Sequence, residues 1–141
     1  MNRGYLNSYE SGEIKLPFGT GRTSPIASYD VARVLAKILS DPAPLHIGKI
    51  YELTGLKSQN LNEIAKEYSL ALGRPIKYVD MPMEEWAIHE LKPIGLPDHV
   101  YHHMYTMAHL HKENRYDRQV NTVEDLTGIK PKSVKDWVQA H

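Results

Sequence analysis

The 141 residues carry 17 Lys and Arg side chains against 17 Asp and Glu, so the formal net charge is zero and no strong field favours nucleic acid or an anionic membrane. There is no cysteine, which excludes disulfides, thiol catalysis and cysteine-based zinc or iron–sulfur sites. No apolar run approaches the roughly 18–20 residues of a membrane span and no signal segment opens the chain, so we expect a soluble, cytoplasmic protein without membrane or nucleic-acid partners.

The length favours a single domain covering residues 1–141, in which residues 1–22 form an irregular or partner-docking segment. This segment is polar and contains four glycines, so it is a poor start for an independent core. Tyr5 and Leu6 hint at the tail of a helix. Residues 13–18 alternate between polar and apolar side chains, as a short strand does.

The first clear helix is predicted at residues 28–39. Pro25 keeps the residue before it extended, Ser28 is a plausible N-cap, and Asp30 lies in the first turn, where a carboxylate complements the helix dipole. Apolar residues then recur at helical spacing on one face: Val31, Val34, Leu35, Ile38 and Leu39.

The centre of the chain predicts a strand, a capped helix and a second strand. The β-prone run Ile50–Leu53 stops at a turn, and Asn60 with Glu63 has the spacing of a capping box. The helix that follows ends at Gly73, which suits a left-handed residue, and Ile76–Val79 alternates as a half-buried strand.

The remainder of the chain predicts further helices. They cover residues 82–92, 97–112, 121–126 and 134–139, with Pro97 opening the second, Thr122 and Asp125 spaced as a cap pair, and Ser133 capping the last. The fold class is therefore α/β and α-rich, with few short strands and about five helices.

Histidine is the one enrichment that suggests chemistry. His99 and His103 are four residues apart and could reach one metal ion from one helix face, but no third ligand follows from the spacing, and a helix with histidines at its solvent boundary is the alternative. The chain contains no G-x-S-x-G elbow, P-loop or G-x-G-x-x-G turn, and no Tyr followed four residues later by Lys. We assign no acid, base, nucleophile or metal ligand.

Four motifs, in this order, resemble those of NmrA-like proteins, atypical members of the extended short-chain dehydrogenase/reductase superfamily. The resemblance covers nearly the whole chain from about Glu13 and is specific because the motifs keep their order. The matching residues are 16–22 with Ile26 and 30–32, then 48–55, then 72–78, and finally 126–128 with Pro131, Ser133 and 137–138.

The resemblance implies the carboxy-terminal, substrate-side half of an NAD(P)-binding Rossmann-type protein, without the glycine-rich nucleotide-binding half. In such proteins Lys49–Leu53 would be a late strand of the parallel sheet in the nucleotide domain. Parallel strands need neighbours, so we predict either a homo-oligomer or docking onto a separate nucleotide-binding chain.

The function that the resemblance implies is substrate binding in an NAD(P)H-dependent oxidoreductase of quinones, azo dyes or other small unsaturated molecules, with no cofactor bound and no catalysis by this chain alone. A pocket is expected between residues 22–26 and the later helices, with core packing as the alternative use of its apolar members. The expected contacts are Arg22, Ser24, Ile26, Trp86 and Met104. The alternatives are a protein-interaction module of the co-regulator type and a truncated remnant.

Overall fold

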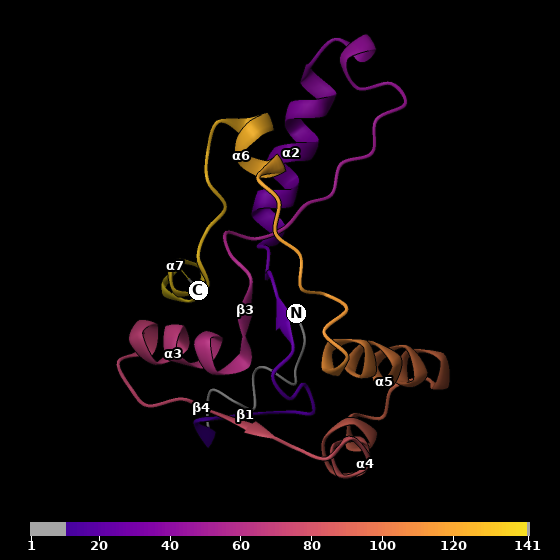
Figure 1. The fold of residues 1–141 in the computed structure, drawn as a ribbon, viewed down its shortest axis with the longest axis vertical. Helices are drawn as coiled ribbons and strands as arrows, with labels where there is room; N and C mark the ends of the chain where they lie inside the picture. Colours follow the sequence, from indigo (N-terminus) through magenta and orange to yellow (C-terminus); the bar gives the residue numbers. More distant parts are fainter. Residues whose placement is uncertain (1–10, 141) are drawn as a thin grey trace. The chain divides into compact units, whose positions relative to one another are not determined.

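The computed structural model describes residues 11–140, which separate into two compact units (Figure 1). The first unit combines Met1–Thr23 with Gln59–Asp117, and the second combines Ser24–Ser58 with Arg118–His141. The predicted helix tail at Tyr5 and Leu6 lies outside the described residues. Within residues 11–140 no helix is long and apolar enough to span a membrane.

The first unit contains a two-stranded parallel sheet. β1 (Glu13–Leu16) pairs with β4 (Lys77–Asp80) in register from Glu13 opposite Lys77 to Leu16 opposite Asp80. Ile14 is buried on this sheet, at 2% exposure. The strands predicted at residues 13–18 and 76–79 are therefore confirmed, within two residues at their ends.

A second, shorter pair was not predicted. β2 (Arg22–Thr23) runs antiparallel to β3 (Gln59–Asn60), with Arg22 opposite Asn60. Two-residue strands carry too little periodic pattern to be recognised in a sequence. Their pairing matters because it brings Arg22 to the start of the helix that follows β3.

That helix, α3 (Leu61–Leu72), begins and ends as its sequence predicts. Asn60 Oδ1 accepts from the Glu63 amide at 2.9 Å, and Glu63 Oε2 accepts from the Asn60 amide at 3.1 Å, which completes the capping box. Gly73 ends the helix with a left-handed φ of 66°. The buried face of α3 includes Leu61, Ile64 and Ala65.

The helical region after β4 is less regular than predicted. In place of one helix over residues 82–92, the chain forms α4 (Met83–Trp86), a π-helical turn η2 (Ala87–Leu91) and a 3₁₀ turn η3 (Lys92–Ile94), which ends at Gly95 with a φ of 70°. Pro93 has no amide proton to continue an α-helix, so the last turn changes type. α5 (Asp98–Lys112) follows, with Pro97 as its N-cap residue.

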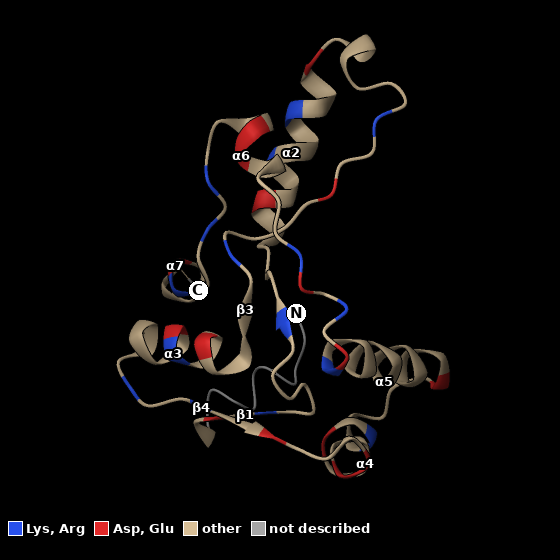
Figure 2. Cartoon of the chain, viewed as in Figure 1, with Lys and Arg blue, Asp and Glu red and all other residues tan. Residues whose placement is uncertain are grey.

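The second unit is built on α2 (Ser28–Ser40), which packs against α6 (Thr122–Thr127) through buried residues that include Val34 and Val123. η1 (Ala43–Leu45) and α7 (Val134–Gln139) complete its helices. Both units mix basic and acidic side chains along their elements, as Figure 2 shows, in keeping with the zero net charge.

Three predicted helix starts in this unit had different outcomes. Ser133 caps α7 as expected, because its side chain accepts from the Asp136 amide at 3.1 Å. The prediction for α2 was wrong: Ala27 is the extended N-cap residue, and Ser28 is already helical. The Thr122 and Asp125 cap pair was also wrong, because Asn121 precedes the helix and makes no side-chain cap bond.

The predicted strand at Lys49–Leu53 is not formed in the described chain. Residues 49–58 contain no strand, and Ile50 is 98% exposed. A sequence with strand propensity still needs a neighbouring strand to complete its backbone hydrogen bonds, and residues 11–140 offer none at this segment.

Candidate functional site

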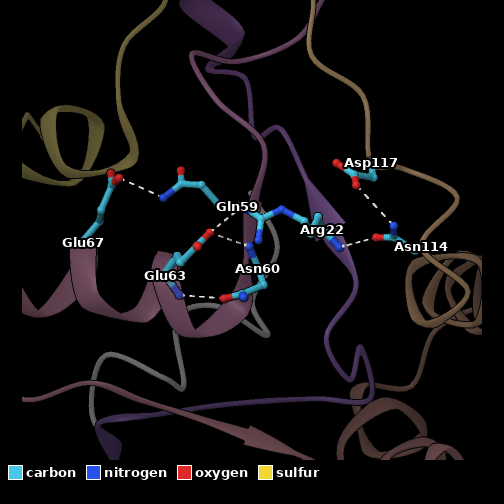
Figure 3. Close-up of polar contacts among 7 residues, drawn as sticks. All are labelled: Arg22, Gln59, Asn60, Glu63, Glu67, Asn114 and Asp117. Atoms are coloured by element: carbon cyan, nitrogen blue, oxygen red, sulfur yellow. Dashed lines mark hydrogen bonds and ion pairs between the residues drawn. The ribbon is translucent and has the colours of Figure 1, made fainter.

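A polar cluster in the first unit surrounds Arg22 (Figure 3). The Arg22 guanidinium donates to Glu63 Oε2 at 2.9 Å, and the Arg22 amide donates to Asn114 Oδ1 at 2.8 Å. The cluster thus joins β2, the first turn of α3 and the segment after α5. We call these side chains the Arg22 cluster: Arg22, Gln59, Asn60, Glu63, Glu67, Asn114 and Asp117.

The ion pair in this cluster orients the guanidinium more than it stabilises the fold. The side chains of Arg22 and Glu63 are 35% and 42% exposed, and pairs with that much solvent contribute about 0–1 kcal/mol. Glu63 Oε2 accepts from Arg22 and also from the Asn60 amide, and the second bond belongs to the helix cap. The cap therefore fixes the carboxylate to which the Arg22 guanidinium donates. The result is a partly exposed cation held in one place.

Asn114 is the one non-glycine residue of the described chain with a positive φ, at 57°. Asparagine tolerates this left-handed conformation better than most residues, and such positions often lie at functional sites. Its amide nitrogen donates to Asp117 Oδ2 at 3.3 Å, while its oxygen accepts from the Arg22 amide. Asn114 is not among the residues predicted from the sequence, although an asparagine just after a helix is a recognisable signal.

A buried pair supports the other side of the cluster. Gln59 Nε2 donates to Glu67 Oε1 at 2.9 Å, and the two residues are only 3% and 9% exposed. Because buried polar groups must be hydrogen-bonded, this bond fixes β3 against α3. These contacts hold the site in position, and none pairs a nucleophile with a base.

An aromatic stack lies in the same unit. The rings of Phe18 and His111 are parallel within 2° with centroids 4.2 Å apart, and Tyr116 lies 4.4 Å from His111 at a tilt of 42°. Burial lowers the pKa of His111, so the imidazole is neutral near pH 7. No local pattern predicts this stack, since Phe18 and His111 are far apart in the chain.

The turn after β1 is tied to β4 through Tyr78 and Asp80. The Phe18 amide donates to Tyr78 Oη at 3.1 Å, and the Gly19 amide donates to Asp80 Oδ1 at 2.9 Å. Burial first, and then the neighbouring Asp80 carboxylate, raise the pKa of Tyr78 well above its ordinary value of 10.0. The phenol therefore stays protonated as a hydrogen-bond donor and does not act as a base.

The buried imidazole predicts a pH dependence of stability. Because the pKa of His111 is lowered in the folded protein from its ordinary 6.5, the unfolded chain binds a proton that the folded chain does not. Stability should be full above pH 6.5 and fall as the pH drops below it. We expect His111→Phe to reduce this loss, measured by urea unfolding between about pH 7.5 and pH 5.5.

The matched control for this experiment is His99→Phe, since His99 is exposed on the same helix, α5. In this variant the free energy of unfolding should depend on pH as it does in the parent protein. An unchanged slope in the His111→Phe variant would show that other groups cause the acid loss.

The five predicted substrate contacts do not all fall in one unit. Arg22, Trp86 and Met104 belong to the first unit, whereas Ser24 and Ile26 belong to the second. Trp86 is 5% exposed and part of the core, in line with the packing alternative. The Ser24 hydroxyl donates to the Arg118 carbonyl. The common pocket therefore stays a prediction.

The one G-x-G of the chain does not fit a dinucleotide. A Cβ on Gly21 would lie 2.0 Å from the His111 carbonyl oxygen, so the space that this glycine leaves is filled by the protein's own backbone. The Gly19 amide already donates to Asp80, whose carboxylate would also repel a pyrophosphate. A phosphate cradle needs free amides and open space, whereas here the Gly19 and Gly21 amides donate to Asp80 and Phe18 and the space at Gly21 is filled.

The described residues hold no group of three or more His, Cys, Asp or Glu side chains that could bind a metal ion. His99 and His103 are both exposed on α5.

Comparison with known proteins decides the relationship. No protein-family model matches the chain. The chain is 29% identical to the NAD(P)H azoreductase of Xenophilus azovorans over 132 residues, which are 94% of this chain and 45% of that protein. It is 31% identical to quinone oxidoreductase 2 of Escherichia coli over 80 residues, 57% of this chain and 27% of that protein.

The chain is related to NAD(P)H-dependent oxidoreductases of the NmrA-like type. A solved NADPH-dependent quinone oxidoreductase from Escherichia coli has the same fold, with a TM-score of 0.82 at 24% identity, over 98% of this chain and 50% of that one. The chain thus spans about half the length of the relatives that it matches. It corresponds to the carboxy-terminal part of such proteins. The predicted resemblance and the predicted α-rich α/β fold are confirmed.

Proposed function

We propose that this chain is the substrate-side half of an NAD(P)H-dependent oxidoreductase that acts on quinones, azo compounds or similar small unsaturated molecules. The supporting observation is the extent of the match: 94% of the chain aligns with an NAD(P)H azoreductase but accounts for only 45% of it. A related quinone oxidoreductase was solved in complex with NADPH. The proposal keeps the cytoplasmic location expected from the sequence, which shows no membrane span and no signal segment.

In this proposal the chain orients the substrate and a nucleotide-binding half supplies the hydride. The Gly19-x-Gly21 turn argues against a cofactor site here, because its space and one amide are already used. The proposed contacts are those expected from the sequence, with Arg22 as the cation that orients an electron-rich oxygen or nitrogen of the substrate. Its guanidinium is fixed by Glu63 and about one third exposed.

The test is a pair of binding measurements on the 141-residue chain. NADPH titrated by calorimetry should give no saturable heat at micromolar concentrations. A soluble naphthoquinone sulfonate or the azo dye methyl red should raise the melting temperature, because a ligand at 100 times its Kd stabilises by about 2.7 kcal/mol. Arg22→Met should abolish this rise, and Arg74→Met, outside the Arg22 cluster, should leave it unchanged.

Either of two results would contradict the proposal. One is NADPH-dependent reduction of the dye by this chain unaided. The other is a melting temperature that neither the quinone nor the dye changes.

A further inference from the structure

The two ring nitrogens of His111 lie in different surroundings. Nδ1 is buried and has no hydrogen-bond partner in the part of the chain that the structure describes. The residue as a whole is only half-buried, and Nε2 is not among its enclosed atoms, so solvent reaches this side of the ring. Within residues 11–140 no group hydrogen-bonds to Nε2. This nitrogen can therefore meet a ligand.

The burial of Nδ1 decides which nitrogen of the ring carries the proton. Burial lowers the pKa of His111, so the imidazole is neutral near pH 7 and only one nitrogen is protonated. Buried N–H groups without an acceptor are rarer in proteins than buried acceptors without a donor. The proton therefore belongs on Nε2, where water or a ligand accepts it, and Nδ1 keeps its lone pair.

Two aromatic contacts fix the plane of this imidazole. Phe18 lies parallel to it within 2° at a centroid distance of 4.2 Å, and Tyr116 lies 4.4 Å from it. Aromatic pairs prefer a narrow range of geometries, so rotation of the imidazole would break its contact with Phe18. The Nε2–H donor consequently keeps one direction. A donor that is fixed before the ligand arrives costs less entropy on binding.

The segment that carries His111 also supports Arg22. The His111 carbonyl oxygen packs against Gly21, the residue before Arg22, where an added Cβ would lie 2.0 Å from it. The same carbonyl accepts from the Asn114 amide at 3.0 Å, and Asn114 Oδ1 accepts from the Arg22 amide at 2.8 Å (Figure 3). The backbone of His111 and the backbone that leads into Arg22 are therefore in direct contact.

We propose that the Nε2–H of His111 is a second hydrogen-bond donor to the substrate, beside the Arg22 guanidinium, and that it binds a quinone carbonyl oxygen or an azo nitrogen. The inference rests on the proposed function, in which Arg22 orients the same substrate. A neutral imidazole donates a hydrogen bond without adding a net charge, which matches acceptors that are themselves uncharged. It also provides specificity, because a ligand of the same shape without the acceptor leaves the donor unpaired.

The first measurement titrates a naphthoquinone sulfonate into the 141-residue chain and its variants. His111→Phe keeps an aromatic ring against Phe18 but removes the donor, so the Kd should rise about three- to tenfold, the effect of one lost hydrogen bond. His111→Gln keeps an N–H donor and loses the ring, so it should keep most of the affinity although it melts at a lower temperature. His99→Phe, exposed on the same helix, should change neither property.

Two further measurements separate the hydrogen bond from the ring contacts. Naphthalene sulfonate, which has the same charge but no carbonyl group, is the matched ligand, and its Kd should be equal for the parent and His111→Phe. An NMR spectrum of the imidazole nitrogens at neutral pH tests the tautomer without any ligand. It should place the proton of His111 on Nε2.

Three results would overturn this inference and leave the proposed function intact. They are a quinone Kd that His111→Phe does not change, an equal loss of affinity in His111→Gln and His111→Phe, and a proton on Nδ1 in the NMR spectrum. A parent chain that binds neither the quinone nor methyl red would instead contradict the proposed function, and this inference with it.

Discussion

Asp30→Ala is expected to lower the free energy of unfolding by about 3–5 kcal/mol, the effect of removing one partner from a buried ion pair. Asp30 is fully buried, pairs with Arg33, and accepts the Lys132 amide proton at 2.9 Å. Without the carboxylate, the Arg33 guanidinium keeps the Lys130 carbonyl at 3.4 Å and the Tyr29 ring, whose centroid lies 5.6 Å from Cζ. Its buried Nε has no hydrogen-bond partner in the described structure. Urea unfolding followed by circular dichroism measures the change.

Two controls separate this pair from ordinary helix electrostatics. Glu85→Ala removes an exposed carboxylate from the first turn of α4 and should change stability by no more than about 0.5 kcal/mol. Asp30→Asn keeps the shape of the side chain and one acceptor oxygen. Its loss of stability should therefore lie between those of Glu85→Ala and Asp30→Ala. If Asp30→Ala costs only about 0.3–1 kcal/mol, the carboxylate acts merely as a dipole partner, the role that its sequence position suggested.

Asp30 illustrates what a single sequence can and cannot predict. Its place in the first turn of α2 followed from local pattern, as did the capping box of Asn60 and Glu63 and the left-handed Gly73. These features depend on residues within one or two turns of each other. The burial of Asp30 depends on Lys132, 102 residues away, and no local spacing encodes that contact.

The Arg22 cluster divides in the same way. Arg22 was predicted as a site residue by resemblance, and Glu63 as a capping residue by spacing. Their ion pair depends on the pairing of β2 with β3, two strands of two residues each, which no periodic pattern can reveal. Asn114 joins them from a third segment, across 92 residues. The parts of the site were predictable, and their assembly was not.

The unpaired segment at residues 49–53 is the converse case. Its sequence has strand propensity, but the predicted strand is not formed. Such a propensity describes how side chains fit a pleated sheet, so it needs a neighbouring strand to take effect. Around this segment the described chain provides the contacts of His46 with Tyr51 and Asp41 but no strand.

Gly21→Ala is expected to destabilise the first unit by about 3 kcal/mol or more, because neither side of the clash can move freely. The new Cβ would lie 2.0 Å from the His111 carbonyl oxygen and 3.0 Å from the Phe18 carbonyl oxygen. Both are backbone atoms: one ends α5 and the other belongs to the turn after β1. Relief of the contact must therefore separate α5 from the turn that leads into Arg22.

The matched control is Gly73→Ala, where the φ of 66° makes a side chain strained but no atom lies within 4 Å of the added Cβ. It should cost about 1–2 kcal/mol, the penalty for a left-handed residue alone. The excess in Gly21→Ala measures the steric clash. Since the same contact positions Phe18 against His111, the variant should also lose part of the acid sensitivity caused by the buried imidazole. A Gly21→Ala protein no less stable than Gly73→Ala would mean that α5 and the turn separate easily, and that the Arg22 cluster is not rigidly supported from that side.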